Sequence, residues 1–201
     1  MAKELLIIFI KNPEKGRVKT RLAHSVGEVK ALSVYQKLLW HTRQIVSDLV
    51  ADKCVAYSNY INQRDIWEND KFRKCVQLGE DLGSKMQNAI AVGFKAHYDS
   101  ICLIGSDIFE LTSSIIEQAF HDLHNHDLVL GPALDGGYYL IGMNRPLPEL
   151  FKNIPWGSEQ VLDKTLDKAA KHSLRISQLP TLNDIDTIGD IRNDDRAYLL
   201  S

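Results

Sequence analysis

The feature that most constrains the fold is a short run of apolar residues that ends in a glycine and an acid. Ile101–Ile104 are consecutive apolar residues, and Gly105–Asp107 follow them directly. A strand that is apolar on both faces is typical of a parallel sheet covered by helices on both sides, so we expect Asp107 at the carboxyl end of a buried strand. Ligands of open α/β sheets bind outside those ends, which makes this acid a candidate for holding a divalent cation beside a nucleotide. Alternatively, Asp107 only caps a turn or the helix expected to begin near Thr112.

The composition is that of a globular chain without a large surplus of charge. Of the 201 residues, 44% are hydrophobic and 25% are charged, which excludes disordered and fibrous classes. The length fits a single domain over residues 1–201. The net charge of −2 argues against a nucleic-acid or membrane-surface binder, because such proteins carry many excess cations. No apolar run approaches the length that spans a membrane.

The N-terminus and the cysteines favour the cytoplasm. The chain passes within four residues into the apolar run Leu5–Ile10, which is too short for the core of a signal peptide and lacks a cleavage site. Cys54, Cys75 and Cys102 lie in apolar runs and share no metal-ligand spacing. We interpret them as buried free thiols in a reducing compartment.

A strongly basic loop follows the first expected strand. Pro13 and Gly16 are expected to prevent regular structure over residues 11–22. The cations crowded into this segment repel one another unless an anion or water screens them; they are Lys11, Lys15, Arg17, Lys19 and Arg21. Its position after a strand favours a phosphate-binding loop, and the alternative is a solvated basic loop.

Helices and strands alternate along the rest of the chain. Apolar positions at helical spacing predict helices over residues 28–50, 84–97 and 111–123. Short apolar runs predict strands over residues 54–57, 75–78, 127–130 and 138–143. Ser158 is a plausible N-cap of a further helix, and a short helix ends the chain. We therefore predict a three-layer α/β sandwich with a mostly parallel central sheet.

Several junctions place glycines beside acids. Gly79–Met86 surrounds Asp81 with two glycines at a strand-to-helix junction, where backbone N–H groups could hold a base or ribose. Gly131–Gly137 brackets Asp135 with glycines, which indicates close approach either to a ligand or to a neighbouring strand in a hairpin.

Acids and histidines near the ends of two expected helices could form a metal or ligand site, but they could also be ordinary helix-end residues. Asp184 and Asp186 alternate ahead of the last helix, where Asp186 or Thr187 could be only its cap. His121, His124 and His126 complete no recognisable zinc pattern, so we interpret them as a solvated helix end.

These candidates fall at one edge of the predicted sheet. The basic loop, Asp81 and Asp107 follow strands, and Asp135 and Asp186 come from later connections. The cations would hold phosphates, and the carboxylates would hold a divalent metal. Together they make a site for a nucleotide diphosphate. Neither the Walker nor the Rossmann glycine spacing is present.

Seven motifs in this order carry a resemblance that covers nearly the whole chain. They are Lys11–Pro13 with Gly16–Leu22, Asp81–Gly83, Gly105–Asp107, Gly131–Ala133, Asp135–Gly142, Trp156–Ser158 and Asp184–Thr187. The chain resembles the bacterial DUF2064 group of glycosyltransferase-A-type proteins, often called arsenosugar-biosynthesis-type glycosyltransferases or selenodomain-associated transferases. More distantly it is similar to the phospholactate and molybdenum-cofactor guanylyltransferases, which share the nucleotide-diphospho-sugar transferase fold.

The resemblance implies roles for individual residues and Mg²⁺ or Mn²⁺ as cofactor. It places Asp107 and Asp186 on the metal and Asp135 near the acceptor, with Asp107, Asp135 and Lys19 in catalysis. The residues implied for the nucleotide are Lys11, Gly16, Lys19, Arg21, Asp81, Gly83 and Lys85. The chain departs from the family pattern at Phe109, where proline is usual and where a change could alter the path of the metal-binding loop, and at Lys85, where arginine is common. Ser106 also stands where a literal Asp-x-Asp motif would place an acid.

Three functions are compatible with this reading. The first is transfer of a sugar from a nucleotide-diphospho-sugar to a small-molecule acceptor, with Asp135 as a candidate base. The second is nucleotidyl transfer from a nucleoside triphosphate to a phosphorylated small molecule, which needs almost the same groups. The third is a catalytically idle nucleotide-binding protein, because a fold does not establish a function.

Overall fold

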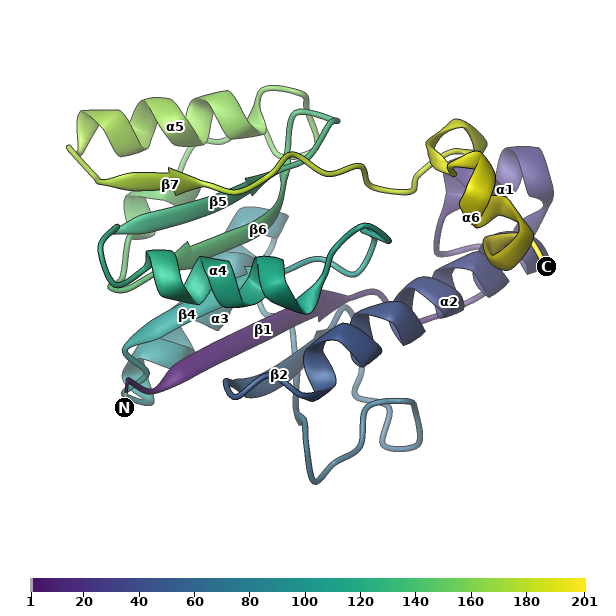
Figure 1. Ribbon diagram of the computed structural model, residues 1–201, viewed down its shortest axis with the longest axis horizontal. Coiled ribbons are helices and arrows are strands. Elements are labelled where there is room, and N and C mark those ends of the chain that lie inside the picture. Colours follow the sequence, from purple (N-terminus) through teal and green to yellow (C-terminus); the bar gives the residue numbers. More distant parts are fainter. Residues whose placement is uncertain (1) are drawn as a thin grey trace.

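The computed structural model describes residues 2–201 and shows one seven-stranded sheet between layers of helices (Figure 1). The strands lie in the order β3-β2-β1-β4-β6-β5-β7, and among the described strands only β6 runs against the others. Their bounds are β1 (Glu4–Ile10), β2 (Asp52–Tyr57), β3 (Arg73–Val76), β4 (Ser100–Ile104), β5 (Leu128–Pro132), β6 (Tyr138–Met143) and β7 (Ile176–Gln178). The predicted α/β sandwich with a mostly parallel sheet is confirmed.

Successive residues of β1 point to opposite faces of the sheet, as the period of a strand requires. Leu6 and Ile8 pack with side chains of α2 and α4, whereas Leu5 and Ile7 pack with side chains of α3 and α5. The helices are α1 (Thr20–Val26), α2 (Glu28–Ser47), α3 (Leu82–Lys95), α4 (Ser113–Asp122), α5 (Val161–Lys171) and α6 (Asn193–Leu199), with 3-10 turns η1 (Pro148–Phe151) and η2 (Ile188–Asp190).

The sheet has a topological switch point between β1 and β4. The chain builds β2 and β3 on one side of β1 and then places β4 on the other side, in parallel register with Ile8 opposite Ile104. Connections that leave two adjacent strands in opposite directions open a crevice at their carboxyl ends, which is where ligands of such sheets bind. Residues 11–19 and 105–107 follow β1 and β4 into this crevice.

Helix α1 and the C-terminal helix α6 meet over α2. Figure 1 shows α1 and α6 side by side at one end of the molecule, above the first turns of α2. Leu22 of α1, Leu38 of α2 and Leu199 of α6 are fully or almost fully buried in one apolar cluster with Ile185. This cluster brings the segment before η2 to the basic loop.

The prediction of an irregular segment over residues 11–22 was wrong at its end. Helix α1 begins at Thr20, because Lys19 adopts a left-handed backbone conformation that ends the loop and Leu22 is buried against α2. Helix α2 ends at Ser47, earlier than predicted, and Val50 is almost fully exposed.

Other helix boundaries differ from the predicted ones because of capping interactions that the apolar pattern does not show. Helix α3 begins at Leu82 and not Ser84, since the Asp81 carboxylate and the Ser84 side chain form a capping box. Helix α5 begins at Val161 after Gln160, and Ser158 is not its N-cap because its hydroxyl donates to the Pro155 carbonyl. Thr187 caps the 3-10 turn η2, whereas the last helix α6 has Arg192 at its N-cap, so the prediction that Asp186 or Thr187 caps the last helix was wrong.

The glycine-rich segment 131–137 forms the connection of an antiparallel hairpin. Strands β5 and β6 pair from Leu128 opposite Met143 to Pro132 opposite Tyr138, with a register shift at Gly131 and Pro132. The hairpin interpretation is therefore confirmed, although its tip also lines a cavity that is described below.

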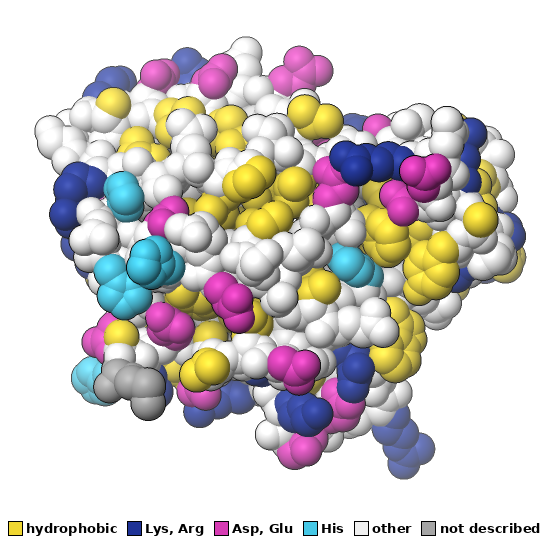
Figure 2. Space-filling model, in the orientation of Figure 1, with side chains coloured by type: hydrophobic (Ala, Val, Ile, Leu, Met, Phe, Trp, Pro, Cys, Tyr) yellow, Lys and Arg dark blue, Asp and Glu magenta, His cyan; other side chains and the backbone are white. Residues whose placement is uncertain are grey.

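The cysteines differ in burial, and the histidines of α4 lie on the surface. Only Cys102 is fully buried; Cys54 and Cys75 are half-buried, and their sulfur atoms lie 3.5 Å apart because β2 and β3 are neighbours. The histidines at the end of α4 gather on the surface (Figure 2).

Within residues 2–201, no helix combines the length and apolarity needed to cross a membrane.

The charge pair at the start of β7 gives a testable pH dependence. The guanidinium and backbone N–H of Arg175 donate to the Asp127 carboxylate over 2.9–3.2 Å, and these bonds lower the pKa of Asp127 from its ordinary value of 3.8. Because the folded pKa is depressed, the stabilisation is present above the ordinary pKa and disappears as the pH falls through the folded one. Asp127→Asn should lower Tm at pH 7 by about 2 °C.

Thermal unfolding of both proteins between pH 3 and pH 8 checks this prediction. The difference in Tm should shrink toward zero at the acidic end, whereas Glu117→Gln, at an exposed position of α4, should show no such trend. A difference in Tm that is equal at all pH values would contradict the assignment to the Asp127 charge.

Candidate functional site

Two adjoining cavities lie at the carboxyl ends of β1 and β4. The larger, which we call the cleft, has a volume of about 910 Å³, and the smaller, the basic pocket, has about 220 Å³. Both are lined by Lys11, Arg21, Asp107 and Asp186, which therefore mark the boundary between them. The structure thus brings cations of the basic loop together with acids from later connections at the switch point, as predicted.

The boundary is organised by one buried ammonium group. Lys19 Nζ lies 2.9 Å from Asp107 Oδ2 and 3.0 Å from Asp186 Oδ1, and the lysine side chain is only 3% exposed. The two carboxylates are more than one-third exposed, so their other oxygens face solvent in the cavities. Lys19 reaches this position because its left-handed backbone, with φ of 47°, places it at the N-cap of α1.

Burial and the two acids act in opposite directions on Lys19. Burial lowers the pKa of the Lys19 ammonium, but the charges and hydrogen bonds of Asp107 and Asp186 outweigh it, so the pKa is raised overall. The side chain is therefore charged at every physiological pH. Arg21 adds a weaker contact, with Nη1 3.5 Å from Asp186 Oδ2.

A buried tyrosine fixes the first strand end against the fourth. The Tyr35 hydroxyl accepts a hydrogen bond from the Lys11 backbone N–H at 2.8 Å, donates to the Lys11 carbonyl at 3.0 Å and lies 3.4 Å from Ser106 Oγ. Burial first, and then the nearby Asp107 charge, raise the pKa of Tyr35. Sequence reasoning placed Tyr35 only in the apolar stripe of α2 and missed this supporting role.

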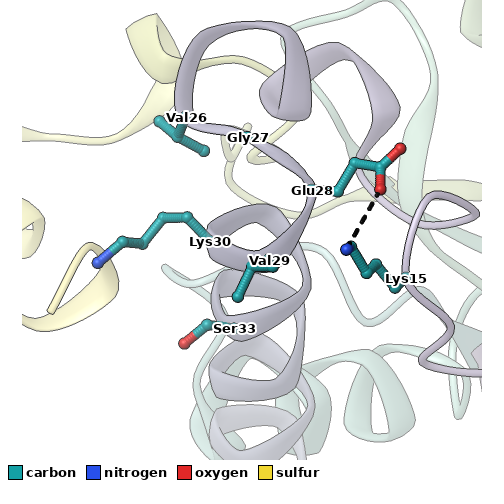
Figure 3. Close-up of a pocket in the computed structure, with 7 residues that line it drawn as sticks. All are labelled: Lys15, Val26, Gly27, Glu28, Val29, Lys30 and Ser33. Atoms are coloured by element: carbon teal, nitrogen blue, oxygen red, sulfur yellow. Dashed lines mark ion pairs between the residues drawn. The ribbon is translucent and has the colours of Figure 1, made fainter.

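The cations of the basic loop do not all reach the cavities. Lys15 turns away and pairs with Glu28 at 3.9 Å beside a separate hollow of about 480 Å³ at the α1–α2 junction (Figure 3). Arg17 lines the basic pocket but is paired with Glu14 at 3.4 Å. Gly16, with φ of 75°, lies in the loop against Glu28 and lines neither cavity.

The residues predicted at the start of α3 lie beside the cleft. Asp81 is exposed and caps the helix, and Lys85 is half-buried; neither lines the cleft, although Leu82 and Met86 do. A Cβ atom on Gly83 would lie 2.2 Å from Trp156 Nε1, so this glycine admits an indole that forms part of the cleft wall. A nucleotide-binding role for Asp81, Gly83 and Lys85 stays a prediction.

Acids outnumber cations around the cleft. Burial, followed by the charges of Asp135 and Asp186, raises the pKa of Asp184 to about 6. Asp135 is exposed at the hairpin tip, where its Oδ1 accepts a 2.8 Å hydrogen bond from the Gly137 backbone. Sequence reasoning named Asp184 only as a neighbour of Asp186. The two residues are two positions apart in a segment without helix, so their side chains point to the same side, and both line the cleft.

The wall of the cleft also contains aromatic residues and one acid that sequence reasoning did not select. Trp156 and Tyr138 line it with their rings in edge contact at 6.4 Å, and Glu159 lies beyond them before α5. The only signal for Trp156 was its place in a short motif before a helix, and Glu159 carried none.

Phe109, which departs from the family pattern, does not point into the site. Its ring packs against His41 at 4.7 Å and Tyr198 at 5.9 Å, on the side of α2 and α6. The backbone at Asp107 is held by a 3.0 Å hydrogen bond from the Ile185 N–H to the Asp107 carbonyl. The loop that follows β4 therefore keeps Asp107 at the boundary of the two cavities.

The boundary acids suit a hard divalent cation. Asp107 and Asp186 offer carboxylate oxygens, and Mg²⁺ typically takes one or two carboxylates and completes its shell with water and substrate phosphates. Within residues 2–201, no group of three or more His, Cys, Asp and Glu residues is arranged to hold an ion by itself. Two carboxylates are the protein ligands expected for a cation that also binds substrate phosphate.

A protein family and a solved structure match this chain over more than half of its length. Residues 41–158 match the family described as "Uncharacterized protein conserved in bacteria (DUF2064)". The structure resembles that of a protein from Desulfovibrio desulfuricans G20 provisionally named a nucleotide-diphospho-sugar transferase, with a TM-score of 0.85, 33% identity, and coverage of 98% of this chain and 91% of that one. No curated protein matches the chain.

More distant solved structures share the fold alone. The inositol-1-phosphate CTP transferase from T. maritima aligns with a TM-score of 0.61 and 14% identity, over 99% of this chain and 96% of that one. The glucosyl-3-phosphoglycerate synthase from Mycobacterium tuberculosis, solved with Mg²⁺ and uridine diphosphate, aligns with a TM-score of 0.54 and 12% identity, over 91% and 70%.

Removal of the buried ammonium should weaken the protein and free the boundary acids. Lys19→Met keeps a side chain of similar length but removes the buried cation between Asp107 and Asp186, so the free energy of unfolding should fall by about 1–3 kcal/mol. Urea unfolding in EDTA measures this change. Mn²⁺ should then restore more stability to the variant than to the wild type, because it replaces the missing charge.

The double variant Lys19→Met with Asp186→Asn serves as the matched control. It removes one of the two opposing carboxylates and should recover part of the lost stability. If Lys19→Met is as stable as the wild type in EDTA, the ion pairs contribute nothing measurable to folding and the assignment fails.

Proposed function

Because the chain belongs to the DUF2064 family, we propose that it is a transferase that moves a sugar from a nucleotide-diphospho-sugar to a small-molecule acceptor with the help of Mg²⁺ or Mn²⁺. The observation that carries the proposal is the boundary between the two cavities. Three cations, Lys11, Lys19 and Arg21, meet two carboxylates, Asp107 and Asp186, at the switch point of the sheet. The relation to the Desulfovibrio desulfuricans protein supports the same class of substrate.

The cations of the boundary would stabilise the departing diphosphate. Lys11 and Arg21 are exposed at its edge and can approach phosphate oxygens, while buried Lys19 supplies a fixed charge behind the carboxylates. Preorganised charges of this kind act most strongly where charge develops in the transition state. Asp107 and Asp186 would hold the metal, which when bound adds positive charge to the same phosphates.

Asp135 is the candidate base of the reaction. Its carboxylate lines the cleft at the hairpin tip and is oriented by the Gly137 backbone N–H. In the proposed step, an acceptor hydroxyl oxygen forms a bond to the anomeric carbon and its proton passes to Asp135. The bond from that carbon to the diphosphate oxygen breaks, and the diphosphate leaves with the electron pair.

Nucleotidyl transfer is the second candidate, and the density of cations in the basic pocket favours it. A triphosphate carries more negative charge than a diphosphate and would make fuller use of the exposed cations Lys11 and Arg21, with buried Lys19 behind them. In that reaction, a phosphate oxygen of the acceptor would attack the α-phosphorus and pyrophosphate would leave. The T. maritima protein with this fold is a CTP transferase by name, which supports keeping the alternative.

Ligand-dependent stabilisation separates the candidates. We expect one nucleotide-diphospho-sugar, tested with and without Mn²⁺ beside a panel of nucleoside triphosphates, to stabilise the protein by about 2.7 kcal/mol at 100 times its Kd. Asp107→Asn should abolish the metal-dependent part, and Glu117→Gln should retain it. Differential scanning fluorimetry gives the shifts in Tm.

The ligand that gives the largest shift in Tm distinguishes the two reactions. A larger shift with a triphosphate than with any nucleotide-diphospho-sugar would favour nucleotidyl transfer. Absence of a metal-dependent shift with every ligand would contradict both reactions, and an undiminished shift in Asp107→Asn would contradict the assignment of the metal site.

A further inference from the structure

The charges in the cleft are divided between its two ends. Lys11 and Arg21 line the end that borders the basic pocket, and they are the only cationic side chains among the described residues that line the cleft. The rest of the cleft, which we call the acceptor end, is lined by Asp135, Glu159 and Asp184 with no lysine or arginine among the described residues. A molecule that enters this end therefore meets negative charge.

From this division we infer that the acceptor is a hydroxyl-bearing molecule without negative charge, such as a sugar or another polyol. The inference rests on the proposed function, since it concerns the partner of the same reaction. Carboxylates accept hydrogen bonds from hydroxyl groups, whereas a phosphate group has only acceptors at neutral pH and is repelled. Phosphorylated ligands are typically bound by arginine or lysine side chains, which the described lining of this end lacks.

The acidic side chains are fixed by backbone packing between two segments. The Leu162 backbone N–H donates to the Gly136 carbonyl at 2.9 Å, which joins the hairpin tip to the start of α5. A Cβ atom on Gly136 would lie 2.1 Å from the Glu159 carbonyl oxygen, and the residue has φ of 84°, so only glycine allows this approach. Asp135 and Glu159 consequently belong to one rigid rim and not to two independent loops.

An aromatic surface faces the same space. The Trp156 ring stacks on Phe151 at 6.5 Å, meets the Tyr138 ring edge-on and fills the position that a side chain on Gly83 would occupy. These contacts hold the indole in place before any ligand arrives. Rigid aromatic rings offer apolar area to the C–H groups of a polyol, while the neighbouring carboxylates take its hydroxyl groups.

This charge pattern bears on the choice between the two reactions. Glycosyl transfer needs only a hydroxyl group on its acceptor, which the acidic end can bind. Nucleotidyl transfer to a phosphorylated molecule requires a phosphate to approach through Asp135, Asp184 and Glu159. The described lining of the cleft therefore favours the first reaction on grounds that are independent of the nucleotide site.

The experiment measures how acceptor charge affects the release of nucleoside diphosphate from the donor that gives the largest thermal shift. Matched acceptors are glucose, glucose 6-phosphate and glucosamine, together with glycerol, glycerol 3-phosphate and choline. We expect acceleration by at least one uncharged or cationic member, and about tenfold or more lower kcat/KM for its phosphorylated counterpart. Pyrophosphate release from the best-binding triphosphate is followed in parallel.

A charge reversal in the rim tests the cause. Glu159→Lys should shift the ratio of kcat/KM between phosphorylated and uncharged acceptors toward the phosphorylated one by about tenfold. Glu117→Lys makes the same change of charge on α4, away from the cleft, and should leave that ratio unchanged. Trp156→Ala should raise KM for the uncharged acceptor more than it lowers kcat.

The results distinguish failure of the inference from failure of the proposed function. If no nucleotide ligand binds, the proposed function fails and the inference with it. If a donor binds but acceleration occurs only with phosphorylated members, or with none of the six, the inference alone is overturned. An equal effect of Glu159→Lys and Glu117→Lys would also overturn it.

Discussion

The buried ammonium of Lys19 is the interaction on which the rest of the site depends. It lies between Asp107 and Asp186, and the second of these contacts joins residues 167 positions apart in the chain. An unpaired buried charge is costly, so the basic loop, the end of β4 and the segment before η2 can reach their positions only together. The α1, α2 and α6 cluster supplies the apolar burial that makes this meeting possible.

The sheet order explains why the meeting occurs where it does. With β1 and β4 adjacent and their connections diverging, the crevice at their carboxyl ends is open to solvent and lined by backbone that is fixed by the strands. Tyr35 closes the base of this crevice by bonding both the N–H and the carbonyl of Lys11. Rigid strands thus position the groups, while the exposed fraction of each carboxylate remains available to a ligand.

Local pattern predicted six of the seven described strands, their mostly parallel sheet and the place of Asp107, because buried strands and the turn after them leave signals within a few residues. The short strand β7 was missed, since none of its three residues is fully buried. The boundaries of α1, α3 and α5 required capping and backbone conformations that apolar spacing does not encode. The ion pairs of Lys19 could not be predicted, since a lysine among five loop cations carries no mark of burial. Glu159 and Trp156 were missed for a related reason: their roles arise from Gly136 and Gly83, whose missing side chains let distant segments approach.

Proteins with this fold include both a sugar transferase and a nucleotide transferase by name, so the fold and the cations at the boundary do not by themselves decide between the two reactions. Both reactions expel a phosphate group from the same end of the cleft and need positive charge there. They differ in what attacks: a hydroxyl group in one and an anionic phosphate in the other. The distinguishing information therefore lies at the opposite end, where the rim of Asp135 and Glu159 and the surface of Trp156 define the charge and shape that an acceptor must match.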